Sequence, residues 1–334
     1  MLLSQNIDLQ NGVLGGLVIG IASSAMLYWT GKVTGISGVV EGVIVANHGE
    51  NKSWTLSYFS GLLSAGAVLV HVYPQAFGEG HQLLLLNPLG YASAGLLTGF
   101  GTRMGSGCTS GHGICGLPRR SVRSLAAVLT FMGTGAISSY LAMNTSLKHL
   151  IAADSMANTD TSDDIVFYVI PTVAVAIVGA TLCNRNFLLN NMVFGGDENN
   201  SIDTDKDSNM QADPASHLTK HIISFSSALL FGMGLGVSGM CNTQRVTDFL
   251  NFSGSAGWDP TLMGVMGGGV IFNLFSFHFM HVNNHAIPCE NTKKMGNVIK
   301  MDFHPDNLKI DWKLITGSAI FGLGWGLGKK FHEL

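Results

Sequence analysis

The stretch GFGTRMGSGCTSGHGICG (residues 99–116) is followed closely by the apolar run SVRSLAAVLTFMGTGAISSYLAM (residues 121–143). The second run is long enough to cross a bilayer as a helix, which takes about 20 mostly apolar residues. The first is short and interrupted by glycine, so we expect it to enter the membrane without crossing it. Irregular backbone is tolerated at that depth only where it is buried in protein or lines a polar cavity. Together the two stretches predict a helical membrane protein with an internal path or pocket.

The rest of the chain repeats this combination of spanning runs and shorter glycine-rich elements. Of its 334 residues, 46% are hydrophobic and only 12% are charged, whereas a soluble domain has about 25% charged residues. Runs of spanning length lie at 11–30, 54–73, 121–143, 165–183, 218–240 and 258–280, and shorter elements at 33–46, 89–104, 109–117, 243–252 and 312–328. We therefore expect an all-α polytopic membrane protein of pseudo-symmetric helical halves, with short re-entrant helices and Gly-rich loops.

A polar, acidic segment at residues 195–216 (GGDENNSIDTDKDSNMQADPAS) divides the chain, because its composition is typical of disordered linkers. It separates a first membrane half at residues 1–194, which contains the Gly/Cys stretch, from a second membrane half at residues 217–334. The sequence thus predicts two membrane halves joined by one linker.

The two halves share a weak internal repeat. Lys32-Val33-Thr34 matches Arg245-Val246-Thr247, and Gly99-Phe100-Gly101 matches Gly322-Leu323-Gly324. Chance similarity between Gly-rich helices is the alternative explanation. In the second register Cys108 falls on Phe331, three residues before the last, so we expect the second half to be truncated at its C-terminus.

The stretch at residues 99–116 carries polar and thiol side chains that a plain amphipathic helix does not need. Successive backbone N–H groups in a Gly-dense turn form an anion-binding nest, particularly next to a helix N-terminus. An intramembrane charge such as that of Arg103 indicates function by default. Thiols suit a ligand with a soft sulfur end, such as thiosulfate, better than they suit sulfate. The candidate substrate-binding residues are therefore Arg103, Gly107, Cys108, Gly111, His112 and Cys115, with Cys241 from the second half.

Other interpretations of this stretch stay open. Small residues and thiols also occur at tight helix crossings, where cysteine behaves as a small hydrophobe. Cys108, His112 and Cys115 have the spacing C-x3-H-x2-C, which could offer soft ligands to zinc or copper, although no fourth ligand is evident nearby. Nucleophilic catalysis by Cys108 lacks an orienting acid close in sequence. We expect no enzyme activity, no cofactor and no metal, with a membrane-embedded Cys/His metal or redox protein as the alternative.

The segment GLLTGFGTRMGSGCTSGHGICGLPRRSVRSLAAVLTFMGTG (residues 95–135) resembles the signature of the YeeE/YedE family of sulfur-compound transporters. TGISGVVEGV (34–43), LLFGMGLGVSGM (229–240) and SAGWDPTLMGVMGGG (255–269) fit the same family, so the resemblance covers most of the membrane-embedded chain. The resemblance implies pseudo-symmetric halves whose short helices and loops enter from both faces. It also implies that thiosulfate passes cysteines at a constriction.

The resemblance places Cys108 on a pore cysteine of that family, with Cys115, His112 and the surrounding glycines in the same motif. Two features depart from the family pattern. No cysteine lies near Gly31–Gly38, where some members carry one, and the last repeat ends in KKFHEL instead of continuing into a Gly-Cys-Pro loop. A non-transporting, truncated family member is therefore the second alternative.

We expect a membrane permease for a small sulfur-containing anion, with thiosulfate as the first candidate, in an integral multi-pass protein for which the plasma membrane is favoured. Its expected partners are then this anion and the lipid bilayer. Whether a sulfur-carrier protein is a further partner is left open by the sequence. The net charge of -3, without a basic block, gives no indication of nucleic-acid binding. The chain contains no P-loop sequence, so we expect passive movement through small gating shifts.

Overall fold

The computed structural model describes residues 2–44, 50–77, 88–144, 214–250, 258–282 and 310–327, which form helices and turns without a strand. The longer helices are α1 (Leu2–Thr30), α3 (Glu50–Val72), α4 (Pro88–Met104), α5 (Val122–Asn144), α9 (Pro214–Val237), α11 (Thr261–Val282) and α12 (Trp312–Leu327). The shorter ones are α2 (Ile36–Ile44), η1 (Pro74–Phe77), η2 (Thr109–Gly116) and α10 (Thr243–Leu250). This confirms the all-α fold predicted from the sequence.

Five of the described helices are long and apolar enough to cross a membrane, namely α1, α3, α5, α9 and α11. Each coincides with a run of predicted spanning length, and the run predicted at residues 165–183 lies outside the described residues. Large apolar side chains such as Leu96 and Phe275 are 74% and 71% exposed, as lipid-facing side chains are. The chain is therefore an integral multi-pass membrane protein.

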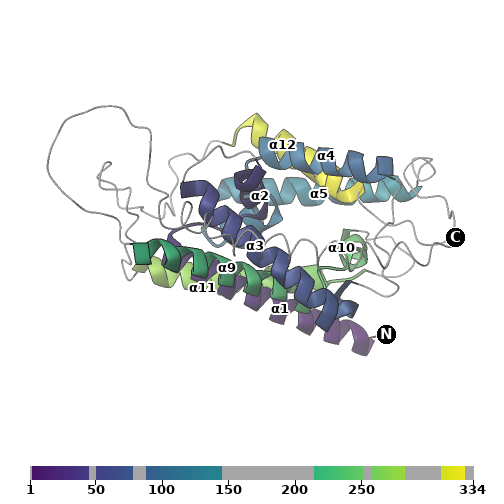
Figure 1. Cartoon of the computed structure of the whole chain (residues 1–334). Helices are drawn as coiled ribbons and strands as arrows, with labels where there is room; N and C mark the ends of the chain where they lie inside the picture. Colours follow the sequence, from purple (N-terminus) through teal and green to yellow (C-terminus); the bar gives the residue numbers. More distant parts are fainter. Residues whose placement is uncertain are drawn as a thin grey trace.

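The helices form two packed groups (Figure 1). In the first group α1 packs against α9 and α11, and α3 packs against α9; in the second group α12 packs against α4 and α5. The short helix α2 lies between the groups and contacts α3, α4 and η2, while η2 itself contacts α5 and α11. The short helices α2 and η2 are thus enclosed by helices from both groups.

Glycine allows the closest helix crossings. A Cβ atom at Gly16 of α1 would collide with the backbone of Val265 in α11, and one at Gly101 of α4 with the backbone of Phe321 in α12. Small residues permit this approach because transmembrane helices associate mainly by van der Waals packing. The abundance of glycine inside apolar runs therefore serves packing as well as the site.

The packing of the two halves is consistent with an internal repeat. In such a repeat α1, α2 and α3 of the first half correspond to α9, α10 and α11 of the second half. The contact of α3 with α9 then has its counterpart in the contact of α11 with α1. The contact of α2 with α3 likewise has its counterpart in the contact of α10 with α11. The turns after α1 and α9 each contain a glycine in the left-handed conformation, Gly31 with φ of 69° and Gly239 with φ of 72°. The part of the predicted linker (residues 195–216) that precedes α9 lies outside the described residues. Phe331 also lies outside them.

Candidate functional site

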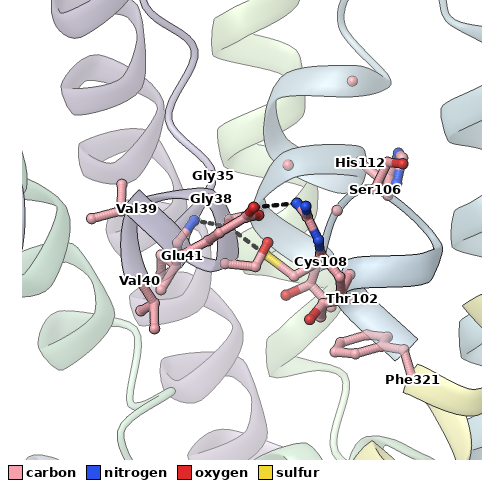
Figure 2. Close-up of a pocket in the computed structure, with 18 of the residues that line it drawn as sticks. Gly35, Gly38, Val39, Val40, Glu41, Thr102, Ser106, Cys108, His112 and Phe321 are labelled. Atoms are coloured by element: carbon pink, nitrogen blue, oxygen red, sulfur yellow. Dashed lines mark hydrogen bonds and ion pairs between the residues drawn. The ribbon is translucent and has the colours of Figure 1, made fainter. Parts of the chain in front are cut away.

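A cavity of about 1330 Å³ lies beside η2. Its wall is made by α2, the end of α4, the turn into η2, η2 itself, the start of α5 and two aromatic side chains of α12, Phe321 and Trp325. Figure 2 shows Cys108 and Phe321 in this wall. Five of the predicted site residues line it, namely Arg103, Gly107, Cys108, Gly111 and His112. Cys115 and Cys241 are not among the described residues that line this cavity.

The segment η2 is a π helix, in which backbone hydrogen bonds join residues five apart. The N–H of Leu117 donates to the carbonyl of His112 at 3.0 Å. Such wide helical turns are rare in proteins, and those that occur are often found at functional sites. Three of its eight residues are glycine, and Gly35 before α2 lies directly against Gly111, so the two segments meet without side chains between them.

Cys108 lies immediately before η2, and its thiol is surrounded by hydrogen-bond donors. Its Sγ lies 3.2 Å from Oγ of Ser110, and the hydroxyl and backbone amide of Ser37 and the amide of Gly111 also hydrogen-bond to it. Because Ser37 is the second residue of α2, the thiol sits at the N-terminal, partially positive end of that helix. This environment favours negative charge at or beside the sulfur.

Ser110 joins the same cluster from the other side. Its Oγ accepts a hydrogen bond from the N–H of Ile36, the first residue of α2, at 3.1 Å. A serine oxygen at this position satisfies one of the backbone donors that the first turn of a helix leaves without a partner. Ser110 therefore fixes the start of α2 against the thiol of Cys108.

His112 holds the turn in place. Its Nε2 lies 3.1 Å from the carbonyl oxygen of Gly105, and its Nδ1 lies 3.2 Å from Oγ of Ser124. A carbonyl can only accept, so Nε2 carries the proton and Nδ1 accepts from the serine hydroxyl. A Cβ atom at Gly107 would come within 2.7 Å of Nε2, which explains the glycine there. Both ring nitrogens of His112 are therefore engaged by protein groups, which tie η2 to the turn after α4 and to α5.

Cys115 is placed behind η2, away from the cavity. Its thiol is 1% exposed and donates to the carbonyl oxygen of Thr34 at 3.2 Å. It packs in an apolar cluster with Ile19, Ile114 and Val265. The structure therefore brings only one thiol of the motif, that of Cys108, to the cavity wall.

Arg103, the predicted cation of the site, forms an ion pair with Glu41 of α2 (Figure 2). The Arg103 side chain is 73% exposed and that of Glu41 38%, and both residues line the cavity. Glu41 was not predicted from the sequence, although it is the charged residue in the mostly apolar ISGVVEGVI of α2. An acidic residue inside an apolar run was the signal that could have identified it.

Asn273 in α11 is a second residue that the sequence analysis missed. Its side chain is fully buried, and its Nδ2 donates to the carbonyl of Ile114 in η2 at 2.8 Å. Its Oδ1 accepts from the hydroxyls of Ser23 and Ser24 in α1. It thereby ties the π helix to the first helix group, and its signal was a lone amide in an apolar spanning helix.

We expect Asn273→Leu to destabilise the protein by about 1–3 kcal/mol, because the carbonyl of Ile114 and two serine hydroxyls then lose a buried partner. The midpoint of thermal unfolding in detergent should fall. An unchanged midpoint would show that η2 does not depend on this anchor.

The described residues contain no group of three or more His, Cys, Asp or Glu side chains arranged to hold a metal ion. His112 directs its two nitrogens at Gly105 and Ser124, and the thiols of Cys108 and Cys115 have different surroundings. Cys108, His112 and Cys115 therefore point their side chains to different partners in this structure.

The two thiols should differ in accessibility. In variants that keep a single cysteine, we expect a small, charged methanethiosulfonate reagent to modify Cys108, which lines the cavity, much faster than Cys115, which is 1% exposed. Mass spectrometry of the intact protein measures both rates under the same conditions. Equal rates at the two positions would contradict the placement of η2.

Comparison with known proteins covers parts of the chain. The model of a family of unknown function, DUF6691, matches residues 219–331. A protein of Xylella fastidiosa strain Temecula1, described as a probable transporter, is 37% identical over 123 residues, which are 37% of this chain and 87% of that protein. A second probable transporter, from Xylella fastidiosa strain 9a5c, is 33% identical over 126 residues, 37% of this chain and 87% of that protein.

No solved structure matches the chain significantly. The sequence relationship nevertheless extends over most of the length of both Xylella proteins. At this identity and coverage, the chain belongs to the family of these probable transporters.

Proposed function

We propose that the protein is a permease for a small sulfur-containing anion, with thiosulfate as the expected substrate, and that the anion binds at Cys108. The observation that carries this proposal is the thiol of Cys108 at the cavity wall, held among the donors of Ser37, Ser110 and Gly111. The relatives described as probable transporters support movement of a solute, and the Gly/Cys motif supports a substrate of the YeeE/YedE type.

The chemistry of this cluster favours an anion with a sulfur end. Backbone amides and hydroxyls donate to anionic oxygen, and the N-terminus of α2 favours negative charge. A thiol adds a polarisable S–H group, which is a weak donor and a weak acceptor. A sulfur-ended anion can therefore contact Cys108 through sulfur while the amides and hydroxyls serve its oxygens, whereas sulfate gains little from the thiol.

The charge around the cavity also favours an anion. The lining includes Arg103, Arg119 and Arg123, against a single lining carboxylate, Glu41, among the described residues. Such an excess of one sign in a concave, partly desolvated wall raises the local concentration of the opposite ion. Arg103 is paired with Glu41 and Arg123 lies 3.4 Å from Asp311, so the lining keeps a smaller net positive charge that attracts the substrate. Weak contacts to the thiol allow the substrate to leave again.

The size of the cavity supports a mechanism in which contacts at its wall select the substrate. A volume of about 1330 Å³ is far larger than an anion of a few atoms, so the shape of the open cavity cannot discriminate among small anions. Discrimination must come from direct contacts, and the donors that converge on Cys108 supply them.

We further propose that residues 1–194 and 217–334 act as two related halves of one transport unit, with 195–216 as their linker.

Protection against alkylation tests substrate binding separately from transport. In a variant that keeps only Cys108, saturating thiosulfate should slow modification of this thiol by a small methanethiosulfonate reagent, and sulfate at the same ionic strength should protect much less. The matched control is a second variant that keeps only Cys241, which is not among the cavity-lining residues described and which neither anion should protect. Equal protection by both anions, or by neither, would contradict a sulfur-selective site at Cys108.

A further inference from the structure

Glu41 is the one acidic side chain among the described residues that line the cavity, and it faces the guanidinium of Arg103. The helix that carries it packs against α3, α4 and η2. On the cavity side α3 contributes Trp54, α4 contributes Arg103 and η2 contributes His112. The remaining charged groups of the lining are Arg119 and Arg123, and Arg123 lies 3.4 Å from Asp311. Arg103 is therefore the cation to which Glu41 is bound in this structure.

This ion pair places a carboxylate in the cavity that the proposed substrate enters. Glu41 belongs to the same short helix whose first turn donates to Cys108, so the carboxylate and the candidate anion site share one helix and one cavity. An anion that enters this cavity approaches Arg103, whose guanidinium has a fork geometry suited to carboxylates and oxyanions alike. The substrate and the Glu41 carboxylate consequently compete for the same cation.

The competition has a consequence for protons. When the anion takes Arg103, the Glu41 carboxylate loses its cation and gains a negative neighbour inside a partly desolvated cavity. Both changes favour the protonated, neutral form of a carboxyl group. Anion binding and proton binding then strengthen each other, and by thermodynamic reciprocity each raises the affinity for the other to the same degree.

We propose that Glu41 is the proton-binding site of a coupled transport cycle, so that one proton moves with each anion in the same direction. This inference rests on the proposed function, and it replaces the passive movement expected from the sequence. Solvent supplies the proton to the Glu41 carboxylate as the anion displaces it from Arg103. The proton returns to solvent when the anion leaves and the ion pair between Glu41 and Arg103 forms again.

The experiment uses the full-length protein in proteoliposomes that enclose a pH-indicating dye and receive labelled thiosulfate outside. Wild-type protein should acidify the lumen in step with thiosulfate uptake, and uptake at low thiosulfate should fall by up to about tenfold for each unit rise in external pH where proton binding is limiting. Glu41→Gln keeps the shape of the side chain but binds no proton. It should take up thiosulfate without luminal acidification and without this pH dependence.

Glu41→Asp is the matched variant, because it keeps a carboxylate that can pair with Arg103 and bind a proton. It should retain acidification coupled to uptake. Wild-type uptake without acidification, or unchanged acidification in Glu41→Gln, would overturn the coupling and leave the proposed permease function standing. Absence of wild-type uptake would overturn the proposed function and the coupling with it.

Discussion

Cys108→Ala is expected to lower thiosulfate uptake into proteoliposomes by at least about tenfold at thiosulfate concentrations well below saturation. Removing a hydrogen bond to a charged group costs about 1.5–3 kcal/mol, and the thiol lies at the centre of the donor cluster formed by Ser37, Ser110 and Gly111. The measurement is the initial rate of labelled thiosulfate uptake, normalised to the amount of protein inserted.

Two control variants separate the role of sulfur from effects on folding. Cys108→Ser keeps a small polar group next to Ser110 but removes the sulfur, so its uptake should lie between that of alanine and that of wild type. Cys241→Ala removes a thiol outside the described cavity lining and should leave uptake unchanged. Because Cys108 also packs against Val128, Phe131 and Phe321, thermal unfolding of each variant must be compared. Wild-type uptake by a folded Cys108→Ala variant would remove the thiol from the mechanism.

Gly101→Ala is expected to destabilise the protein strongly. A Cβ atom at this position would collide with the backbone of Phe321 and approach the carbonyl of Gly317, both in α12. Neither obstacle is the flexible end of a side chain, so the two helices must separate, and overpacking of this kind costs about 1–3 kcal/mol. The midpoint of thermal unfolding in detergent should fall accordingly. Uptake should fall as well, since Phe321 belongs to the cavity wall.

Gly95→Ala is the matched control in the same helix. A Cβ atom at Gly95 meets no other atom within 4 Å, so alanine there should leave the unfolding midpoint unchanged or raise it slightly through its higher helix propensity. Equal effects of the two substitutions would contradict the close α4–α12 crossing. A drop at Gly101 alone would support it.

The fold was largely predictable because hydrophobic length and glycine punctuation are local properties of the sequence. The run at residues 54–73 became α3, and the shorter segment at 109–117 became η2. The irregular element was expected because its composition fits neither a spanning helix nor a surface loop. Its π-helical form was not expected, since backbone hydrogen bonds five residues apart depend on packing against α5 and α11.

The site was predictable only in part, because the sequence does not reveal the direction in which each side chain points. Cys108 and Cys115 share one motif, but η2 turns one thiol to the cavity and the other into an apolar cluster. Sequence spacing does not contain that direction. Likewise, the ion pair of Arg103 with Glu41 and the hydrogen bond of Asn273 to η2 join residues far apart in the chain. Such partners become visible only when the helices are assembled.

Thiosulfate transport is tested most directly by uptake of thiosulfate labelled with radioactive sulfur into proteoliposomes that contain the purified wild-type protein. Uptake should be saturable, absent from protein-free liposomes, reduced by excess unlabelled thiosulfate and reduced much less by the same concentration of sulfate. Uptake no faster than in protein-free liposomes, under conditions where the protein is shown to be folded and inserted, would contradict a thiosulfate permease built around Cys108.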